Sequence, residues 1–140
     1  MIQRSQTLWL LIAAVLAFAS LKLSFFSGDI LVENIKQRQQ YKGMSSLLLM
    51  ILTVVVGVLP LVIIFLFKDR KLQTRLTMIT FLLSILNLVL YYLATQNFVA
   101  NAWSYDLTAI PALAIPVFLI LAARGIYKDE KLIRSVDRLR

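Results

Sequence analysis

Five polar side chains within one long apolar stretch are the residues best placed to do chemistry in this sequence. They recur at intervals of 3, 4, 3 and 4 residues, the spacing of a single helix face, at Thr77, Thr80, Ser84, Asn87 and Tyr91. Hydroxyl and amide groups on one face of a membrane helix either bond to neighbouring helices or line a path for a small polar solute. Because no charged residue accompanies them, we interpret this polar seam as a helix-packing seam, with the solute path as the alternative.

Other residue types exclude most catalytic and metal chemistry. The sequence contains no cysteine and no histidine, which removes disulfides, thiolate nucleophiles, imidazole metal sites and histidine-ligated haem. Proton relays and acid–base catalysis in a membrane usually need a carboxylate within the bilayer. All seven acidic residues fall instead in expected loops and tails, at Asp29, Glu33, Asp69, Asp106, Asp129, Glu130 and Asp137. We therefore expect neither an enzyme nor a bound cofactor.

The elements that must position the seam are long apolar blocks. Hydrophobic residues make up 60% of the 140-residue chain, above the 45–50% typical of a soluble domain. About 20 helical residues cross a hydrocarbon core of about 30 Å, and four blocks reach or approach this length. We predict membrane helices over about 8–27, 44–67, 76–96 and 107–127. The expected fold class is an all-α integral membrane four-helix bundle, with residues 1–140 forming a single domain.

The basic residues predict an orientation. With both termini in the cytoplasm, 11 Lys and Arg residues lie inside and three lie outside, and Lys22 falls within the first span. Cytoplasmic loops are enriched in Lys and Arg, so the pattern predicts N-in and C-in. Lys22 is expected near the outer end of its helix, where it reaches the head groups or pairs with Asp29, seven residues further on.

A short pattern, Lys-Asp-x-Lys-Leu, occurs twice, at residues 68–72 and 128–132. Both copies follow a predicted span that emerges on the cytoplasmic side, where basic residues complement the helix dipole and contact anionic head groups. We interpret the pattern as the same local requirement met twice, with duplication of a helical hairpin as the alternative. The candidate contacts to a partner or to lipid are Arg4, Lys68, Arg70, Lys71, Lys128, Lys131, Arg134 and Arg138.

The tail over 128–140 predicts a short amphipathic cytoplasmic helix. Its apolar residues share one helical face, at Leu132, Ile133, Val136 and Leu139. Such a helix either lies on the inner leaflet or docks into a protein partner. The tail has no ladder of aromatic residues, so we do not expect nucleic-acid binding.

The first segment has two interpretations. It fits the outline of a secretory signal peptide with cleavage after Ala19, yet the apolar run continues to Phe26, which favours an uncleaved span.

The opening MIQRSQTLWLL and the closing KDEKLIRSVDRLR also resemble a family of small four-helix membrane proteins of Bacteroidota, a domain of unknown function (DUF4293-like). This resemblance implies a bacterial inner-membrane location and an uncut N-terminus, and it carries no activity.

We therefore expect an accessory or structural subunit of a membrane complex with a basic cytoplasmic face. Its expected partners are membrane lipids and either another protein or further copies of itself. The alternative is a small oligomeric transporter or channel that uses the polar seam of the third helix.

Overall fold

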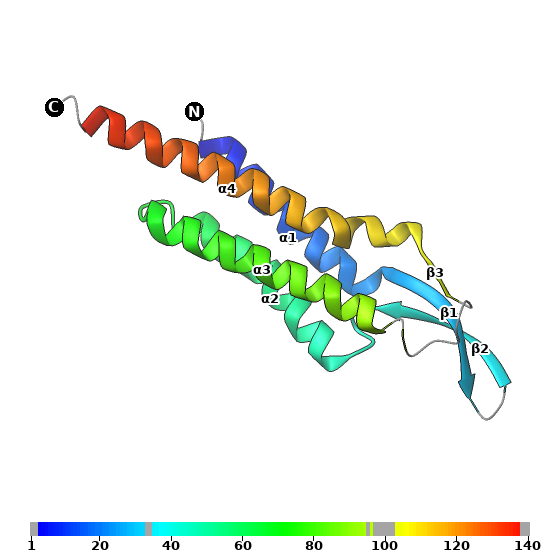
Figure 1. Ribbon diagram of the computed structural model, residues 1–140. Helices are drawn as coiled ribbons and strands as arrows, with labels where there is room; N and C mark the ends of the chain where they lie inside the picture. Colours follow the sequence, from blue (N-terminus) through cyan, green and yellow to red (C-terminus); the bar gives the residue numbers. More distant parts are fainter. Residues whose placement is uncertain (1–2, 33–34, 95, 97–102, 138–140) are drawn as a thin grey trace.

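The structure, a computed structural model, describes residues 3–32, 35–94, 96 and 103–137. Within these ranges, the side chains of 3, 4, 30–32, 35, 36, 103 and 133–137 fall outside the description. The described residues form four long helices and a small sheet (Figure 1). The helices are α1 (Gln3–Lys22), α2 (Leu47–Phe65), α3 (Arg70–Ala94) and α4 (Ile110–Asp137), with the 3-10 turn η2 (Leu107–Ala109) before α4.

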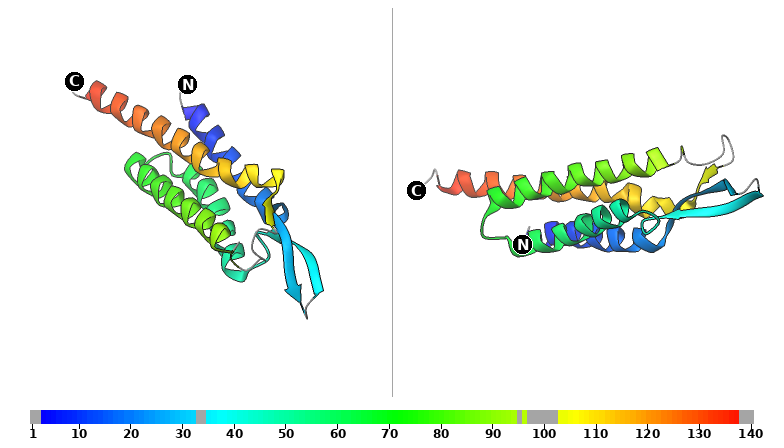
Figure 2. Two further views of the ribbon diagram at one scale, coloured as in Figure 1. Left: turned by 45° about the vertical axis from the view of Figure 1, so that its right-hand side comes forward. Right: turned by 90° about the horizontal axis from the view of Figure 1, so that it is seen from below.

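The helices form a bundle of two layers. One layer holds α3 and α4 and the other holds α1 and α2, as the right-hand view of Figure 2 shows. Each helix packs against two neighbours, because α1 contacts α2 and α4, and α3 contacts the same two. The beginning of α1 and the end of α4 lie at the same end of the bundle, next to the turn between α2 and α3 (Figure 1).

All four helices are long and apolar enough to cross a membrane. The 19 residues of α2, for example, extend about 28 Å, close to the thickness of a hydrocarbon core. The outward surface is also apolar: Leu82 is 65% exposed and Val117 is 55% exposed. These properties fit a multi-pass membrane protein, and they confirm the predicted four long apolar helices.

The centre of the bundle is packed with small and aliphatic side chains. Its core cluster consists of Leu10, Ala13, Ala17, Val56, Ile63, Ile115, Leu119 and Ala122, none more than 2% exposed. Alanine positions on α1 and α4 let these helices approach closely, which favours van der Waals packing in a lipid environment. An aromatic contact reinforces the same pair, since the rings of Trp9 and Phe118 stack with centroids 5.7 Å apart.

The all-α prediction is wrong in one respect, because the chain also contains a three-stranded antiparallel sheet. Strand β1 (Ser24–Val32) lies between β2 (Ile35–Lys42) and β3 (Trp103–Tyr105). The hairpin of β1 and β2 projects beyond the helices at the end opposite the chain termini (Figure 1). We call this the hairpin end.

The first helix, expected to reach residue 27, ends at Lys22. Phe25 and Phe26 extend the apolar run, but they are buried against other side chains instead of lipid: Phe25 stacks on Tyr91 and Phe26 on Tyr41, with ring centroids 4.4 and 5.1 Å apart. Aromatic residues are favoured in half-buried β-strands, so an apolar run that contains them does not by itself indicate a membrane helix.

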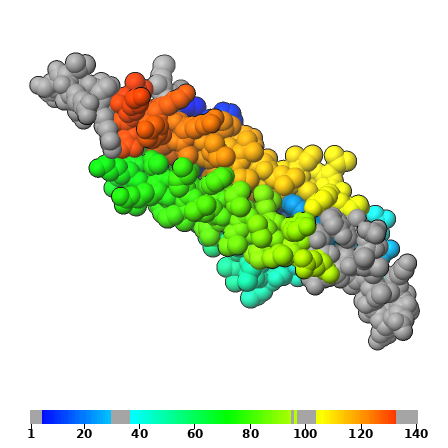
Figure 3. Space-filling model, viewed as in Figure 1, coloured from blue at the N-terminus to red at the C-terminus, as the bar shows by residue number. Residues whose placement is uncertain are grey.

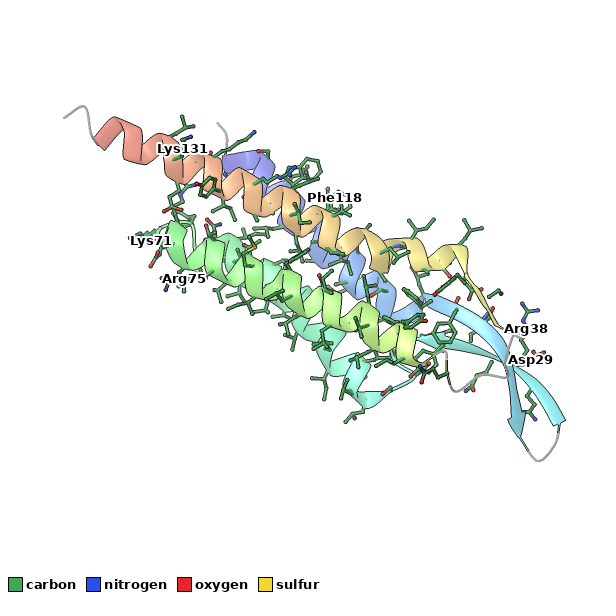
Figure 4. The ribbon with its side chains drawn as sticks, viewed as in Figure 1. Asp29, Arg38, Lys71, Arg75, Phe118 and Lys131 are labelled. Carbon is green, nitrogen blue, oxygen red and sulfur yellow. The ribbon has the colours of Figure 1, made fainter. Side chains whose placement is uncertain are left out.

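The predicted relation between Lys22 and Asp29 on one helix face does not occur, because Asp29 lies in β1. It stands opposite Arg38 in the β1–β2 register, and Figure 4 places both at the hairpin end. Opposite charges across a strand pair are weakly stabilising. Lys22 remains at the last turn of α1, with an exposed side chain.

The other helix limits also differ from the prediction, most of all the start of α3 and the end of α4. Helix α3 begins at Arg70 instead of 76, because Asp69 caps it: the Leu72 backbone N–H donates to Asp69 Oδ1 at 3.1 Å.

The predicted separate tail helix is instead the continuation of α4, which runs unbroken to Asp137. No proline follows Pro116 in this stretch, so the backbone hydrogen bonds continue past the apolar segment. The side chains at 133–137 are outside the description, so the amphipathic face stays a prediction.

Candidate functional site

The predicted contact residues gather at the end of the bundle that holds the chain termini, which we call the basic end. Lys68, Lys71, Lys128 and Lys131 are exposed there and Arg70 is half-buried. In Figure 4, Lys71, Arg75 and Lys131 lie together at this end, on α3 and α4. The side chains of Arg4 and Arg134, and the whole of Arg138, lie outside the described residues.

A buried carboxylate lies at the centre of the basic end. Asp129 is 6% exposed, and its Oδ2 atom accepts hydrogen bonds from Arg70 Nη1, at 3.0 Å, and from the side-chain amide of Gln6. These three residues come from α4, α3 and α1. The other oxygen, Asp129 Oδ1, is buried and accepts no hydrogen bond from the described residues. One carboxylate therefore ties three helices together.

Gln73 extends this cluster to the fourth helix. Its side-chain amide donates to the backbone carbonyl of Ile63 at 3.2 Å, near the end of α2. The Ile63 carbonyl also accepts from the Leu66 backbone N–H at 3.1 Å, so Gln73 supplies a second hydrogen bond to this helix end. We call Gln6, Arg70, Gln73 and Asp129 the Asp129 cluster.

Close packing holds Gln6 in place. A side chain at Gly125 would meet Gln6 Cγ at 2.8 Å, so the glycine provides the space that Gln6 occupies on α4. Beside the cluster is a cavity of about 300 Å³, lined by Gln6, Thr7, Ile64, Phe67, Arg70 and Gln73. The basic end thus combines an ion pair, two amides and a small half-polar cavity.

The two Lys-Asp-x-Lys-Leu copies meet at this cluster. Arg70, in the first copy, pairs with Asp129, in the second, although the two are 59 positions apart. The corresponding aspartate of the first copy, Asp69, caps α3 instead. The expectation that every acidic residue lies in a loop or tail is therefore wrong for Asp129, which lies within α4 and is buried.

The polar seam of α3 faces the interior of the bundle. All five of its side chains are at most 3% exposed, at Thr77, Thr80, Ser84, Asn87 and Tyr91. The three hydroxyls of Thr77, Thr80 and Ser84 donate to carbonyls one turn earlier in α3, at 2.7–2.8 Å. Asn87 Nδ2 donates to Thr53 Oγ1 of α2 at 3.1 Å. The seam thus bonds to Thr53 of α2 and makes several further bonds within its own helix.

A second carboxylate lies at the hairpin end. Asp106 Oδ1 accepts a hydrogen bond from the Ser27 hydroxyl at 2.9 Å, and the Asp106 backbone N–H donates to the Phe25 carbonyl at 3.2 Å. Its Oδ2 atom is buried and has no hydrogen-bond partner among the described residues. Asp106 therefore joins the start of α4 to strand β1.

Sequence reasoning missed Gln6 and Gln73 and did not predict that Asp129 is buried, although helical spacing points to Gln73 and to Asp129. Gln73 lies four residues before Thr77 and so extends the polar seam by one turn. Asp129 follows Leu119, Ala122 and Ile126 at intervals of 3, 4 and 3 residues, on the buried face of α4. Extending each buried face to the end of its helix would have found both residues.

The arrangement holds helices together through hydrogen bonds and one ion pair. In the described part of the chain, no group of three histidine, cysteine, aspartate or glutamate side chains gathers as metal ligands. The Asp129 carboxylate faces a guanidinium and an amide, and such charge-assisted bonds are stronger and shorter than neutral ones. The chemistry of this site is that of a polar connection between helices.

Four helices of membrane-spanning length with a small sheet at one end are compatible with a small multi-pass membrane protein. A family model described as a domain of unknown function, DUF4293, matches residues 2–139, and the chain belongs to this family. No curated protein and no solved structure matches the chain.

Proposed function

We propose that this protein is a structural or accessory subunit of a complex in the bacterial inner membrane, without catalytic activity of its own. One observation carries the proposal. The polar side chains of the Asp129 cluster bond to one another and to a helix carbonyl, and those of the seam bond to Thr53 and to helix carbonyls. Four exposed lysines gather at the basic end, at Lys68, Lys71, Lys128 and Lys131. Buried polar groups of this kind hold helices together, which leaves the charged end available for a partner.

The proposed orientation places the basic end in the cytoplasm, with N-in and C-in. It is supported by the excess of Lys and Arg in the segments at that end, because positively charged loops are retained on the cytoplasmic side. In this orientation the hairpin end and its sheet lie on the opposite side of the membrane.

The test is the native mass of the full-length protein, extracted from its own membrane in a mild detergent, with identification of what co-purifies. We expect a particle larger than the monomer with reproducible partners. The variant K68Q/K71Q/K128Q/K131Q should lose these partners while keeping its fold. The control variant R38Q/K42Q removes positive charge at the hairpin end and should retain them. A particle that survives the four-lysine change would contradict a partner contact at the basic end.

The alternative, a small oligomeric transporter or channel, would use the polar seam as its path. The burial of the seam inside a single chain supports packing over transport, because Thr77 and Thr80 are 0% exposed. Solute flux through reconstituted protein that disappears in S84A/N87L, with the native mass unchanged, would favour the alternative.

A further inference from the structure

A groove between α3 and α4 lies outside the sites described above. It has a volume of about 560 Å³ and is lined by Thr74, Met78 and Phe81 of α3 and by Leu119, Ile120, Ala123, Arg124, Tyr127 and Lys128 of α4. The two helices lie side by side on the face of the molecule shown in Figure 3. The groove is open along this face, where a membrane would supply lipid.

The lining changes character along the groove. Towards the middle of the bundle the walls are apolar, with Phe81, Leu119 and Ile120, and towards the basic end they carry Arg124, Tyr127 and Lys128. The α4 wall from Leu119 to Lys128 extends about 14 Å, close to half of a hydrocarbon core of about 30 Å. A groove of this length matches one acyl chain of the leaflet on the basic side.

The charge at the mouth of the groove is positive. Arg124 and Lys128 have exposed side chains, and no aspartate or glutamate lines the groove. Lys71 and Lys131 continue the same faces of α3 and α4, three residues before Thr74 and three after Lys128. Arginine binds phosphate oxygens through two parallel N–H donors, and lysine adds a mobile positive charge.

The Asp129 cluster keeps one of the two neighbouring acids, Asp129, away from this mouth, while Glu130, three residues after Tyr127, is half-buried. Asp129 follows Lys128 directly, but its carboxylate is buried and bonded to Arg70 and Gln6. The Asp129 side chain therefore points into the bundle, while the side chains of Lys128 and Lys131 remain exposed. The Arg70–Asp129 ion pair thus holds the Asp129 carboxylate away from the cations that line the groove.

We propose that this groove binds one phospholipid with an anionic head group: its acyl chain lies along Met78, Phe81 and Ile120, and its phosphate contacts Arg124 and Lys128. Basic pockets between membrane helices on the cytoplasmic side are suited to such lipids. The inference rests on the membrane location given in the proposed function, and it is independent of whether a protein partner binds.

The test is native mass spectrometry of the full-length protein in a mild detergent, with added phosphatidylglycerol or with phosphatidylcholine of the same acyl chains. We expect phosphatidylglycerol adducts to be favoured on the order of tenfold, since each basic residue near a head group contributes to binding. R124Q/K128Q should remove this preference, whereas R38Q/K42Q, which changes the same number of charges at the hairpin end, should keep it.

A second variant tests the acyl-chain part without changing charge. Ile120 is 40% exposed, so I120W should fold and fill the groove, and it should lower the binding of both lipids. Equal binding of the two lipids by the unchanged protein, or a preference that survives R124Q/K128Q, would overturn the proposal. A homodimer without lipid preference that I120W dissociates would assign the groove to a second copy of the chain and would also overturn it. Absence of co-purifying proteins from the unchanged protein, with the lipid preference present, would count against the accessory role alone.

Discussion

The two ends of the bundle are closed by different chemistry. At the basic end, Asp129 is paired with the Arg70 guanidinium, and both side chains are at most 15% exposed. At the hairpin end, the described partner of the Asp106 carboxylate is the neutral hydroxyl of Ser27, and a cluster of aromatic, leucine and alanine side chains packs beside it. A carboxylate buried among helices requires a counter-charge, because desolvation of a lone charge costs several kcal/mol. At the edge of a loop, a hydroxyl and a backbone contact are sufficient.

The strongest test of this difference removes the counter-charge. Arg70→Ala leaves the Asp129 carboxylate buried with the Gln6 amide as its described donor, so we expect a loss of about 3 kcal/mol in the free energy of unfolding. Unfolding in mixed detergent micelles would measure it. Lys71→Ala, at an exposed neighbouring position, is the matched control and should change stability by less than about 0.5 kcal/mol.

The double variant R70M/D129L separates charge pairing from packing. Replacement of both partners by apolar side chains of similar size is often nearly neutral for a buried pair. We therefore expect it to recover most of the stability lost in Arg70→Ala. A double variant as unstable as the single one would show that the helices at this end depend on the pair itself.

The next test concerns the steric closure of the hairpin end. A methyl group at Gly43 would lie 3.0 Å from both the Leu21 Cα and the Ser20 carbonyl, and 2.9 Å from the Tyr91 hydroxyl. Two of these atoms belong to the backbone and move little, so Gly43→Ala should destabilise the protein by about 2 kcal/mol. Gly125→Ala meets side-chain atoms of Gln6 instead of backbone atoms, and the same unfolding measurement should show a smaller loss.

The smallest expected effect is the difference in stability loss between Asp129→Asn and Asp106→Asn. Asp129→Asn keeps an acceptor for Gln6 but removes the charge opposite Arg70, so we expect a loss of about 1–2 kcal/mol. Asp106→Asn still accepts from the Ser27 hydroxyl, and its loss should stay below about 0.5 kcal/mol. If both variants lose the same stability, the proposed contrast between the ends is wrong.

Hydropathy predicted the four long helices because each block is uniformly apolar over a membrane thickness. It could not separate α1 from β1, because Phe25 and Phe26 are as apolar as the helix that precedes them. Their strand conformation depends on pairing with β2 and with β3, whose residues lie about eighty positions later. Such a partner leaves no local signal in the sequence of β1.

The basic end could be predicted as a group of charges, but its arrangement could not. Lysines at span ends follow from composition and position alone. The burial of Asp129 instead depends on Arg70 and Gln6, which come from two other helices. From sequence alone, Asp69 and Asp129 looked equivalent, and only the packing of α4 against α1 and α3 distinguishes them.

The position of Asp129 in the chain has a consequence for biosynthesis. Gln6 and Arg70 are synthesised before α4, which carries the acceptor that they share. The earlier helices therefore exist before their common acceptor does. A chain that stops before α4 lacks this contact, so the side chains of Gln6 and Arg70 are left without the carboxylate that they bond in the structure.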